Sequence, residues 1–164
     1  LPSPLTIILQ VGCFIILCDT IGYWAHRLLH HPTLYATFHK QHHEFHTNHP
    51  VASSYFGTVD DLLTGVLPTL AGPVIFKSHV LVTFLWVALR ICETTEAHFG
   101  YTQIFSFPPF TMFAALRPAN WHDFHHSHNT GNYGTFFIFW DRVCGTDKAY
   151  HKFYKTGAGN KRRV

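Results

Sequence analysis

Residues 26–43 read His-Arg-Leu-Leu-His-His-Pro-Thr-Leu-Tyr-Ala-Thr-Phe-His-Lys-Gln-His-His and contain two histidine clusters. His26 to His30 has the pattern HxxxH, His39 to His43 has the pattern HxxHH, and a third cluster, His122 to His126, repeats HxxHH. Residues three and four apart lie on one helix face with Cβ atoms about 5–6 Å apart, so each cluster can direct its imidazoles at one point. Together the clusters offer eight nitrogen ligands, more than one ion uses. The sequence therefore predicts a pair of metal ions.

Neutral imidazole suits iron, zinc, copper and nickel, so the residue type does not select the metal. A structural zinc site closes with four ligands, whereas two octahedral ions with open positions would use eight or nine histidines. His98 is a ninth candidate, because it follows an apolar stretch that returns the chain to the proposed site. The predicted ligands are His26, His30, His39, His42, His43, His98, His122, His125 and His126.

The acidic residues nearby are candidates for a supporting role. Glu93, Glu96 and Asp123 could orient ligand imidazoles through their second ring nitrogen, and ordinary solvated carboxylates are an equal alternative. The remaining histidines are not predicted to be ligands: His31, His46, His49, His79, His128 and His151.

The composition points to a membrane. Only 13% of the 164 residues are charged, about half the roughly 25% typical of soluble domains. Pro4 to Tyr23 spans about 20 residues, roughly 30 Å as a helix, which matches the apolar thickness of a bilayer. A signal peptide is the rival interpretation, but the segment has no basic region before it and runs directly into the first histidine cluster. We expect a transmembrane helix that continues into the first ligand helix, and an N-terminal part preceding this chain, which starts without Met.

Residues 62–92 form a second apolar stretch, interrupted by Pro68, by Gly72-Pro73 and by the polar Lys77-Ser78-His79. One long kinked span and a hairpin of two short helices are the competing interpretations. If the histidines before and after this stretch share one site, the chain between them crosses the membrane an even number of times. The hairpin is therefore expected.

The expected fold is an all-α integral membrane protein, in which transmembrane helices carry a histidine-rich helical domain that encloses a di-metal site on the cytoplasmic face. We expect one domain over residues 1–164, divided into a transmembrane helix (1–24), the first two histidine clusters (25–49), a membrane helical hairpin (57–97), the third cluster with a cap (98–150) and a basic tail (151–164). The tail belongs to a region that holds half of all Lys and Arg, but no nucleic-acid recognition motif accompanies it.

Other chemistries lack their sequence signatures. The chain has no G-x-S-x-G elbow, no phosphate-binding glycine loop, no CxxCH haem motif and no CxxC pair. It also has no dinucleotide fingerprint. Reducing equivalents for chemistry with O2 would therefore come from a partner protein.

The order of these motifs resembles the fatty acid hydroxylase superfamily of membrane non-haem di-iron enzymes, and within it the C-4 methylsterol oxidases. The matching strings include His26 to Pro32, His39 to Phe45, Gly72-Pro73, Glu93-Thr94, Glu96 to Tyr101, His122 to His126, Gly131 to Tyr133 and Trp140 to Asp147. The resemblance covers roughly residues 19–150.

This resemblance implies two non-haem iron ions held by the nine histidines, O2 as co-substrate, and electrons from NAD(P)H delivered through cytochrome b5 and its reductase. It also implies a site on the cytoplasmic face of the endoplasmic reticulum membrane and oxidation of a sterol 4-methyl group. The chain departs from the family pattern at His46 to Val51, at Phe99 and at Thr102 to Ile104, where a lipid would pack. Sterol side-chain, fatty acid or sphingolipid oxidation by the same kind of site is the alternative, and a non-catalytic membrane metal or haem protein is a remote one.

Overall fold

The computed structural model describes residues 1–46, 50–98 and 120–156, and these residues are helical, with no β-strand among them. The helices are α1 (Pro4–Leu29), α2 (Pro32–Leu34), η1 (Tyr35–His39), η2 (His42–Glu44), η3 (Pro50–Ser54), α3 (Thr58–Asp60), η4 (Asp61–Val66), α4 (Leu67–Ile75), α5 (Val80–Ala97), α7 (Asn120–His128), α8 (Phe139–Cys144) and α9 (Lys148–Lys155). The expected helical architecture is confirmed for this part of the chain. The strings at Phe99 and at residues 102–104, the residue His49 and the end of the basic tail lie outside the described residues.

Helix α1 is long and apolar and carries the first histidine cluster at its end. The Ser3 side chain accepts a hydrogen bond from the Thr6 N–H, and Pro4 stands in the first turn, where a missing N–H costs nothing. Its 26 residues include a window of mean hydropathy 2.0, of which only 22% is buried. Among the described residues, α1 is the one helix long and apolar enough to cross a membrane. It runs without a break into His26, as expected.

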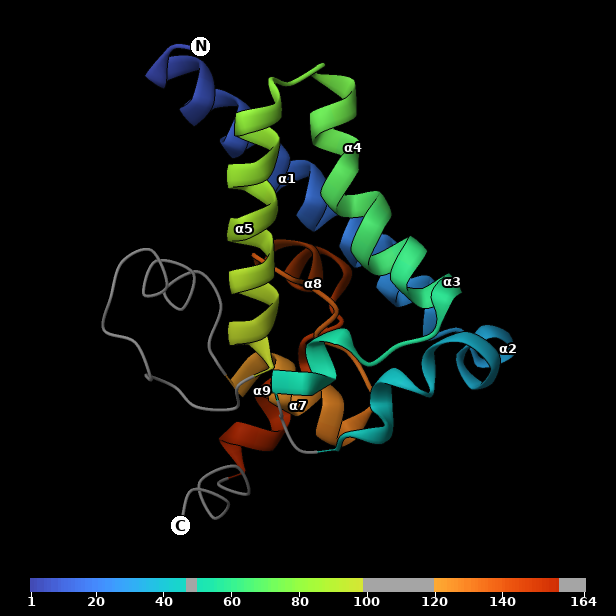
Figure 1. Ribbon diagram of the computed structural model, residues 1–164. Coiled ribbons are helices and arrows are strands. Elements are labelled where there is room, and N and C mark those ends of the chain that lie inside the picture. The colour runs from blue at the N-terminus through green and yellow to red at the C-terminus, as the bar shows by residue number, and fades with distance from the viewer. Residues whose placement is uncertain (47–49, 99–119, 157–164) are drawn as a thin grey trace.

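A helical hairpin follows, with α3, η4 and α4 in one arm and α5 in the other (Figure 1). Its turn lies at residues 76–79, where the sequence predicted a polar break. The interruption expected at Gly72-Pro73 was wrong, because both residues lie inside α4, whereas Pro68 stands where η4 ends and α4 begins. Pro68 lies in the first turn, and Pro73 has no N–H to offer the carbonyl of Thr69 four residues earlier. That carbonyl instead accepts a hydrogen bond of 2.7 Å from the Trp86 indole of α5.

The arms pack against α1 through one aromatic core. Phe14, Cys18, Val82, Trp86 and Phe136 are buried together. A Cβ on Gly72 would lie 2.4 Å from a ring carbon of Phe14, so only glycine lets α4 approach α1 this closely.

A buried carboxylate joins the C-terminal part of the chain to α1. Asp19 accepts hydrogen bonds from the backbone N–H groups of Phe136 and Phe137, at 2.9 and 3.0 Å, and from the Thr135 hydroxyl. Asp141 does the same for the loop before α8, where it accepts from the N–H groups of Tyr133 and Gly134. These two acids fix the segment that follows α7 beside the end of α1.

Candidate metal centre

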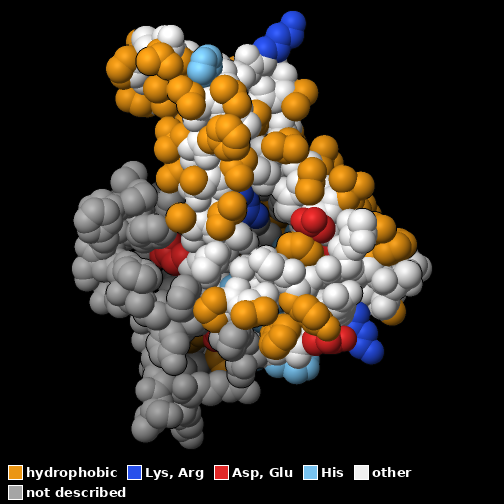
Figure 2. All heavy atoms as spheres, viewed as in Figure 1, with side chains coloured by type: hydrophobic (Ala, Val, Ile, Leu, Met, Phe, Trp, Pro, Cys, Tyr) orange, Lys and Arg blue, Asp and Glu red, His pale blue; other side chains and the backbone are white. Residues whose placement is uncertain are grey.

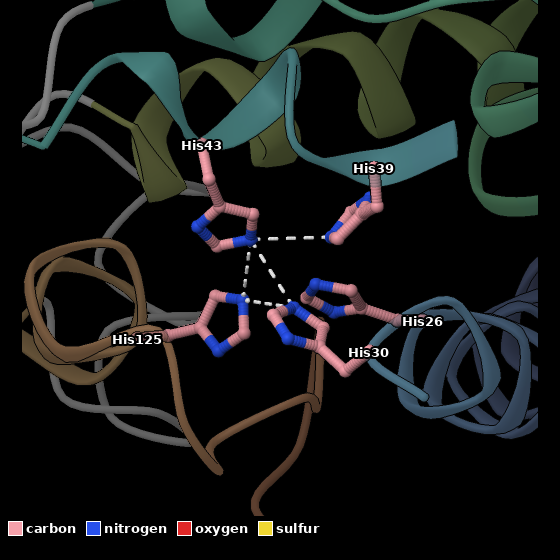
Figure 3. A group of neighbouring side chains, drawn as sticks. All are labelled: His26, His30, His39, His43 and His125. Carbon is pink, nitrogen blue, oxygen red and sulfur yellow. Dashed lines mark hydrogen bonds between the residues drawn. The ribbon is translucent and has the colours of Figure 1, made fainter. Parts of the chain in front are cut away.

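The nine predicted ligands form two adjacent groups. The first group is His26, His30, His39, His43 and His125, and the second is His42, His98, His122 and His126. Within each group one nitrogen of every ring lies within 4.8 Å of the corresponding nitrogen of every other ring. Figure 3 shows the first group, in which rings from three separate segments point toward a common centre.

Each HxxHH cluster divides between the two groups, and the prediction that each cluster aims at one point was wrong in this respect. His39 and His43 serve the first group, while His42 serves the second. The third cluster is divided in the opposite sense, because His125 serves the first group and its neighbour His126 the second. Consecutive helical residues point about 100° apart, so neighbouring histidines cannot share one ion.

The spacing of the ring nitrogens fits a bound cation. In the first group Nε2 of His43 lies 3.1 Å from Nε2 of His30 and 3.2 Å from those of His39 and His125. In the second group Nε2 of His122 lies 3.0 Å from that of His98 and 3.1 Å from that of His126. Nitrogens bound at about 2.1 Å and at right angles around one metal ion would be about 3.0 Å apart.

Hydrogen bonds between the rings cannot replace that cation. Nδ1 of His125 donates to the carbonyl of Gly131 at 2.5 Å, and Nδ1 of His39 donates to Asp60 at 2.7 Å. Each of these rings, when neutral, therefore carries a lone pair on Nε2. Both lone pairs face Nε2 of His43, which can donate at most one proton. A shared metal ion would satisfy all three nitrogens.

The second ring nitrogens are held by the protein, which sets the orientation of the rings. Nδ1 of His26 donates to the Tyr133 carbonyl at 3.1 Å, and Nδ1 of His98 donates to the Thr94 carbonyl at 2.7 Å. A carboxylate takes this role at His39, whose Nδ1 donates to Asp60. Sequence reasoning missed Asp60, because it stands at the start of the apolar hairpin and resembled a polar extension of it. Glu93, predicted as an orienting acid, forms a buried ion pair with Arg90.

Burial keeps these rings in the form that binds metal. Removal from water lowers the pKa of His39 to about 3, and burial together with the neighbouring His39 lowers the pKa of His42 to about 4. Burial, followed by the neighbouring histidines of the two groups, also lowers the pKa of His125 and of His126. Neutral imidazole is the metal ligand, so the apo site is ready for an ion at neutral pH.

Of the six histidines not predicted to be ligands, five are described, and none of those five joins either group. His31 and His79 accept hydrogen bonds from backbone N–H groups at the starts of α2 and α5. His151 contacts Asp147 at 3.1 Å. These side chains stabilise helix ends and turns.

A cavity of about 400 Å³ opens onto both groups. His26, His39, His42, His98 and His122 line its lower end, and its walls rise between the two arms of the hairpin. Figure 2 shows hydrophobic side chains spread over α4 and α5, with a hollow between these helices in which charged side chains are visible. The pair of histidine groups is therefore reached through a cavity among apolar helices.

The fatty acid hydroxylase family model matches residues 11–146. The chain belongs to this family. That membership confirms the predicted resemblance. All nine histidines of the two groups lie within the matched region.

Relatives at similar identity carry different names. The chain is 38% identical over 155 residues to Very-long-chain aldehyde decarbonylase GL1-8 of Oryza sativa subsp. indica, covering 93% of this chain and 57% of that protein. It is 37% identical over 143 residues to Methylsterol monooxygenase 1 of Rattus norvegicus, covering 87% and 47%. It is 36% identical over 155 residues to Methylsterol monooxygenase 2-2 of Arabidopsis thaliana, covering 93% and 57%. The chain thus spans about half the length of these curated relatives. No solved structure matches it.

Proposed function

We propose that this protein is an O2-dependent lipid monooxygenase that holds two iron ions in its histidine groups and oxidises the 4-methyl group of a sterol intermediate. The observation that carries the proposal is the opening of both histidine groups onto one cavity among apolar helices. A closed structural metal site would need neither the cavity nor nine ligands.

The protein's own residues have three tasks in this reaction. The nine imidazoles hold the ions, and their second nitrogens, fixed by Asp60 and by backbone carbonyls, keep the ring nitrogens aimed at them. The apolar walls of the cavity, among them Val66, Leu70 and Val87, bind the lipid and exclude water. Two iron ions, when bound, supply the O2 activation needed to hydroxylate an unactivated C–H bond.

The sterol assignment is supported by the two methylsterol monooxygenases among the relatives. The absence of a dinucleotide fingerprint from the sequence supports an external donor, which we propose to be cytochrome b5 with its NAD(P)H-dependent reductase. We propose the endoplasmic reticulum membrane as the location, with the histidine groups facing the cytoplasm. The long apolar helix α1 is consistent with a membrane position.

Sterol profiling tests the proposal. Cells that lack their own 4-methylsterol oxidase would express the protein or its His42→Ala variant, with His31→Ala as a matched control outside both groups. We expect 4,4-dimethylsterols to disappear with the unaltered protein and the control, and to persist with His42→Ala. Persistence with the unaltered protein, at good expression and with bound iron, would exclude the sterol as substrate.

Decarbonylation of a very-long-chain aldehyde is the second candidate, because relatives named as very-long-chain aldehyde decarbonylases match the chain at a similar level of identity. The same cells supplied with a very-long-chain aldehyde would distinguish the two candidates. Consumption of the aldehyde without any change in 4-methylsterols would favour this one.

A further inference from the structure

A buried ion pair lies in the wall of the cavity and belongs to neither histidine group. Arg90 and Glu93, one turn apart on α5, both line the cavity, and Nη1 of Arg90 donates to the Glu93 carboxylate. Arg90 is 9% exposed and Glu93 1% exposed. Burying a charged pair among apolar helices is costly, and packing alone does not require it.

The guanidinium retains unused donor capacity. It has five N–H bonds and accepts no hydrogen bond itself. One nitrogen is engaged by Glu93, and the buried Cys18 side chain lies close enough to act on the guanidinium. The face of the group lies 5.7 Å from the Phe136 ring centre, and Nε has no hydrogen-bond partner among the described residues. A ligand that complements this group must bring an acceptor oxygen.

The surrounding charges select the kind of oxygen. Glu93 balances Arg90, and Asp19 lies close enough to act electrostatically on both. Among the described residues, a carboxylate ligand would add negative charge to an end of the cavity where Glu93 and Asp19 already lie near Arg90. A neutral hydroxyl or carbonyl oxygen brings no such penalty.

The position of the pair on α5 places that oxygen relative to the metal ligands. The Arg90 side chain extends toward Glu93. Glu93 lies five residues before His98, the C-terminal cap of α5, which corresponds to about 7.5 Å along the helix axis. A bound oxygen would therefore lie near the carbon that is oxidised rather than at the far end of a long lipid. In a 4-methylsterol the 3-hydroxyl has this relationship to the methyl group.

We propose that the Arg90–Glu93 pair is a specificity determinant that binds a neutral hydroxyl or carbonyl oxygen of the lipid, adjacent to the carbon to be oxidised. This inference rests on the proposed function for the identity of the lipid. The pair orients the apolar substrate in the cavity, and Arg90 donates the hydrogen bond.

Equilibrium binding, measured without turnover, tests the inference on the purified protein in nanodiscs. The probes are tritiated 4,4-dimethylcholestan-3-ol, the matching 3-ketone and the matching 3-deoxy hydrocarbon. A hydrogen bond from a charged donor predicts that alcohol and ketone bind about tenfold or more tightly than the hydrocarbon. Equal binding of all three probes, or a ketone that binds as weakly as the hydrocarbon, would overturn the proposal without any variant.

Variants assign the preference to the pair. The double variant Arg90→Gln/Glu93→Gln removes both charges together, so no single buried charge is left alone, and it should bring the alcohol-to-hydrocarbon ratio close to one. Ala88→Gln, which adds an amide at an exposed position of α5 outside the cavity lining, should leave the ratio unchanged. An unchanged ratio in the double variant would overturn the role of the pair. If Arg90 is needed for tighter binding of the oxygen-bearing probes but no sterol is oxidised, the proposed function is wrong and this inference holds. If all three probes are oxidised equally, the proposed function holds and this inference is wrong.

Discussion

Asp60 accepts a hydrogen bond of 2.7 Å from Nδ1 of His39, and both side chains are buried. The Thr64 hydroxyl donates to the other oxygen of the same carboxylate at 3.0 Å. The start of the hairpin thereby fixes a predicted ligand that lies 21 residues earlier in the chain. The packing of the apolar arm and the geometry of the first histidine group are therefore connected.

Replacing Asp60 by Ala should weaken metal binding at the first histidine group. Loss of such a partner typically lowers metal affinity about 10–100-fold, because the ring is no longer held in one tautomer and orientation. Titration with Co²⁺, followed by absorbance, measures the affinity of each group. Glu44→Gln is the matched control, since Glu44 is an exposed carboxylate that contacts Tyr55. An affinity unchanged in Asp60→Ala would mean that His39 is held by packing alone.

The division of the clusters predicts which metal each variant loses. The unaltered protein should bind two Co²⁺ ions per chain, consistent with the two groups. His43→Ala should weaken the first site and His42→Ala the second, although the two residues are neighbours. Metal analysis after dialysis, with His31→Ala as control, checks the stoichiometry. Identical losses in both variants would contradict two separate centres.

Stability of the metal-free protein should fall as the pH is lowered. The pKa of His39 in the folded protein is about 3 and that of His42 about 4, below the value near 6.5 expected in the unfolded chain. Below about pH 6.5 the unfolded state therefore binds protons that the folded state excludes, and each such group costs roughly 1.4 kcal/mol per pH unit until its folded pKa is reached.

Thermal unfolding of the solubilised apoprotein at pH 7.5 and pH 5 measures this effect. The unfolding midpoint should be lower at pH 5. His42→Gln should reduce the difference between the two midpoints, because the unfolded chain then has one fewer histidine that binds a proton at pH 5. The exposed His31 provides the control variant His31→Gln, which should leave the difference as it is. A midpoint independent of pH would show that these rings are not neutral in the folded apoprotein.

Substitution by Ala should have opposite effects on stability at two glycines, Gly72 of α4 and Gly12 of α1. Gly72→Ala places a Cβ against the Phe14 ring and should destabilise the protein by about 1–3 kcal/mol. Gly12→Ala meets nothing within 4 Å and should be neutral or stabilise α1 by up to about 1 kcal/mol. Chemical denaturation in detergent compares the two variants. Equal stability would mean that α4 shifts away from α1 at little cost.

An external reductant should be needed for repeated turnover, since the sequence carries no flavin or nicotinamide motif. Sterol oxidation by the purified protein, supplied with iron and O2 alone, should stop once the electrons that the protein already holds are used. Adding cytochrome b5, its reductase and NADH should start continuous oxidation, measured as product per chain. Sustained turnover without them would refute the requirement for a donor.

The sequence was sufficient to predict that these nine histidines lie together, and to predict the long first helix and the helical hairpin, because each depends on local spacing or on a continuous apolar run. It was not sufficient to divide the histidines between two centres, which depends on how α1, η1, η2 and α7 cross. Asp60 was missed for a similar reason, since its partner is distant in sequence. Pro73 predicted an interruption because it lacks an N–H, but the Trp86 indole uses the carbonyl that this leaves without a partner.

The divided clusters have a consequence for motion. His42 and His43 are joined by a single peptide unit yet serve different groups, and so are His125 and His126. Neighbouring Cα atoms are 3.8 Å apart, so these two covalent tethers limit how far the centres can separate. A shift of the backbone at either pair therefore moves imidazoles of both groups at once.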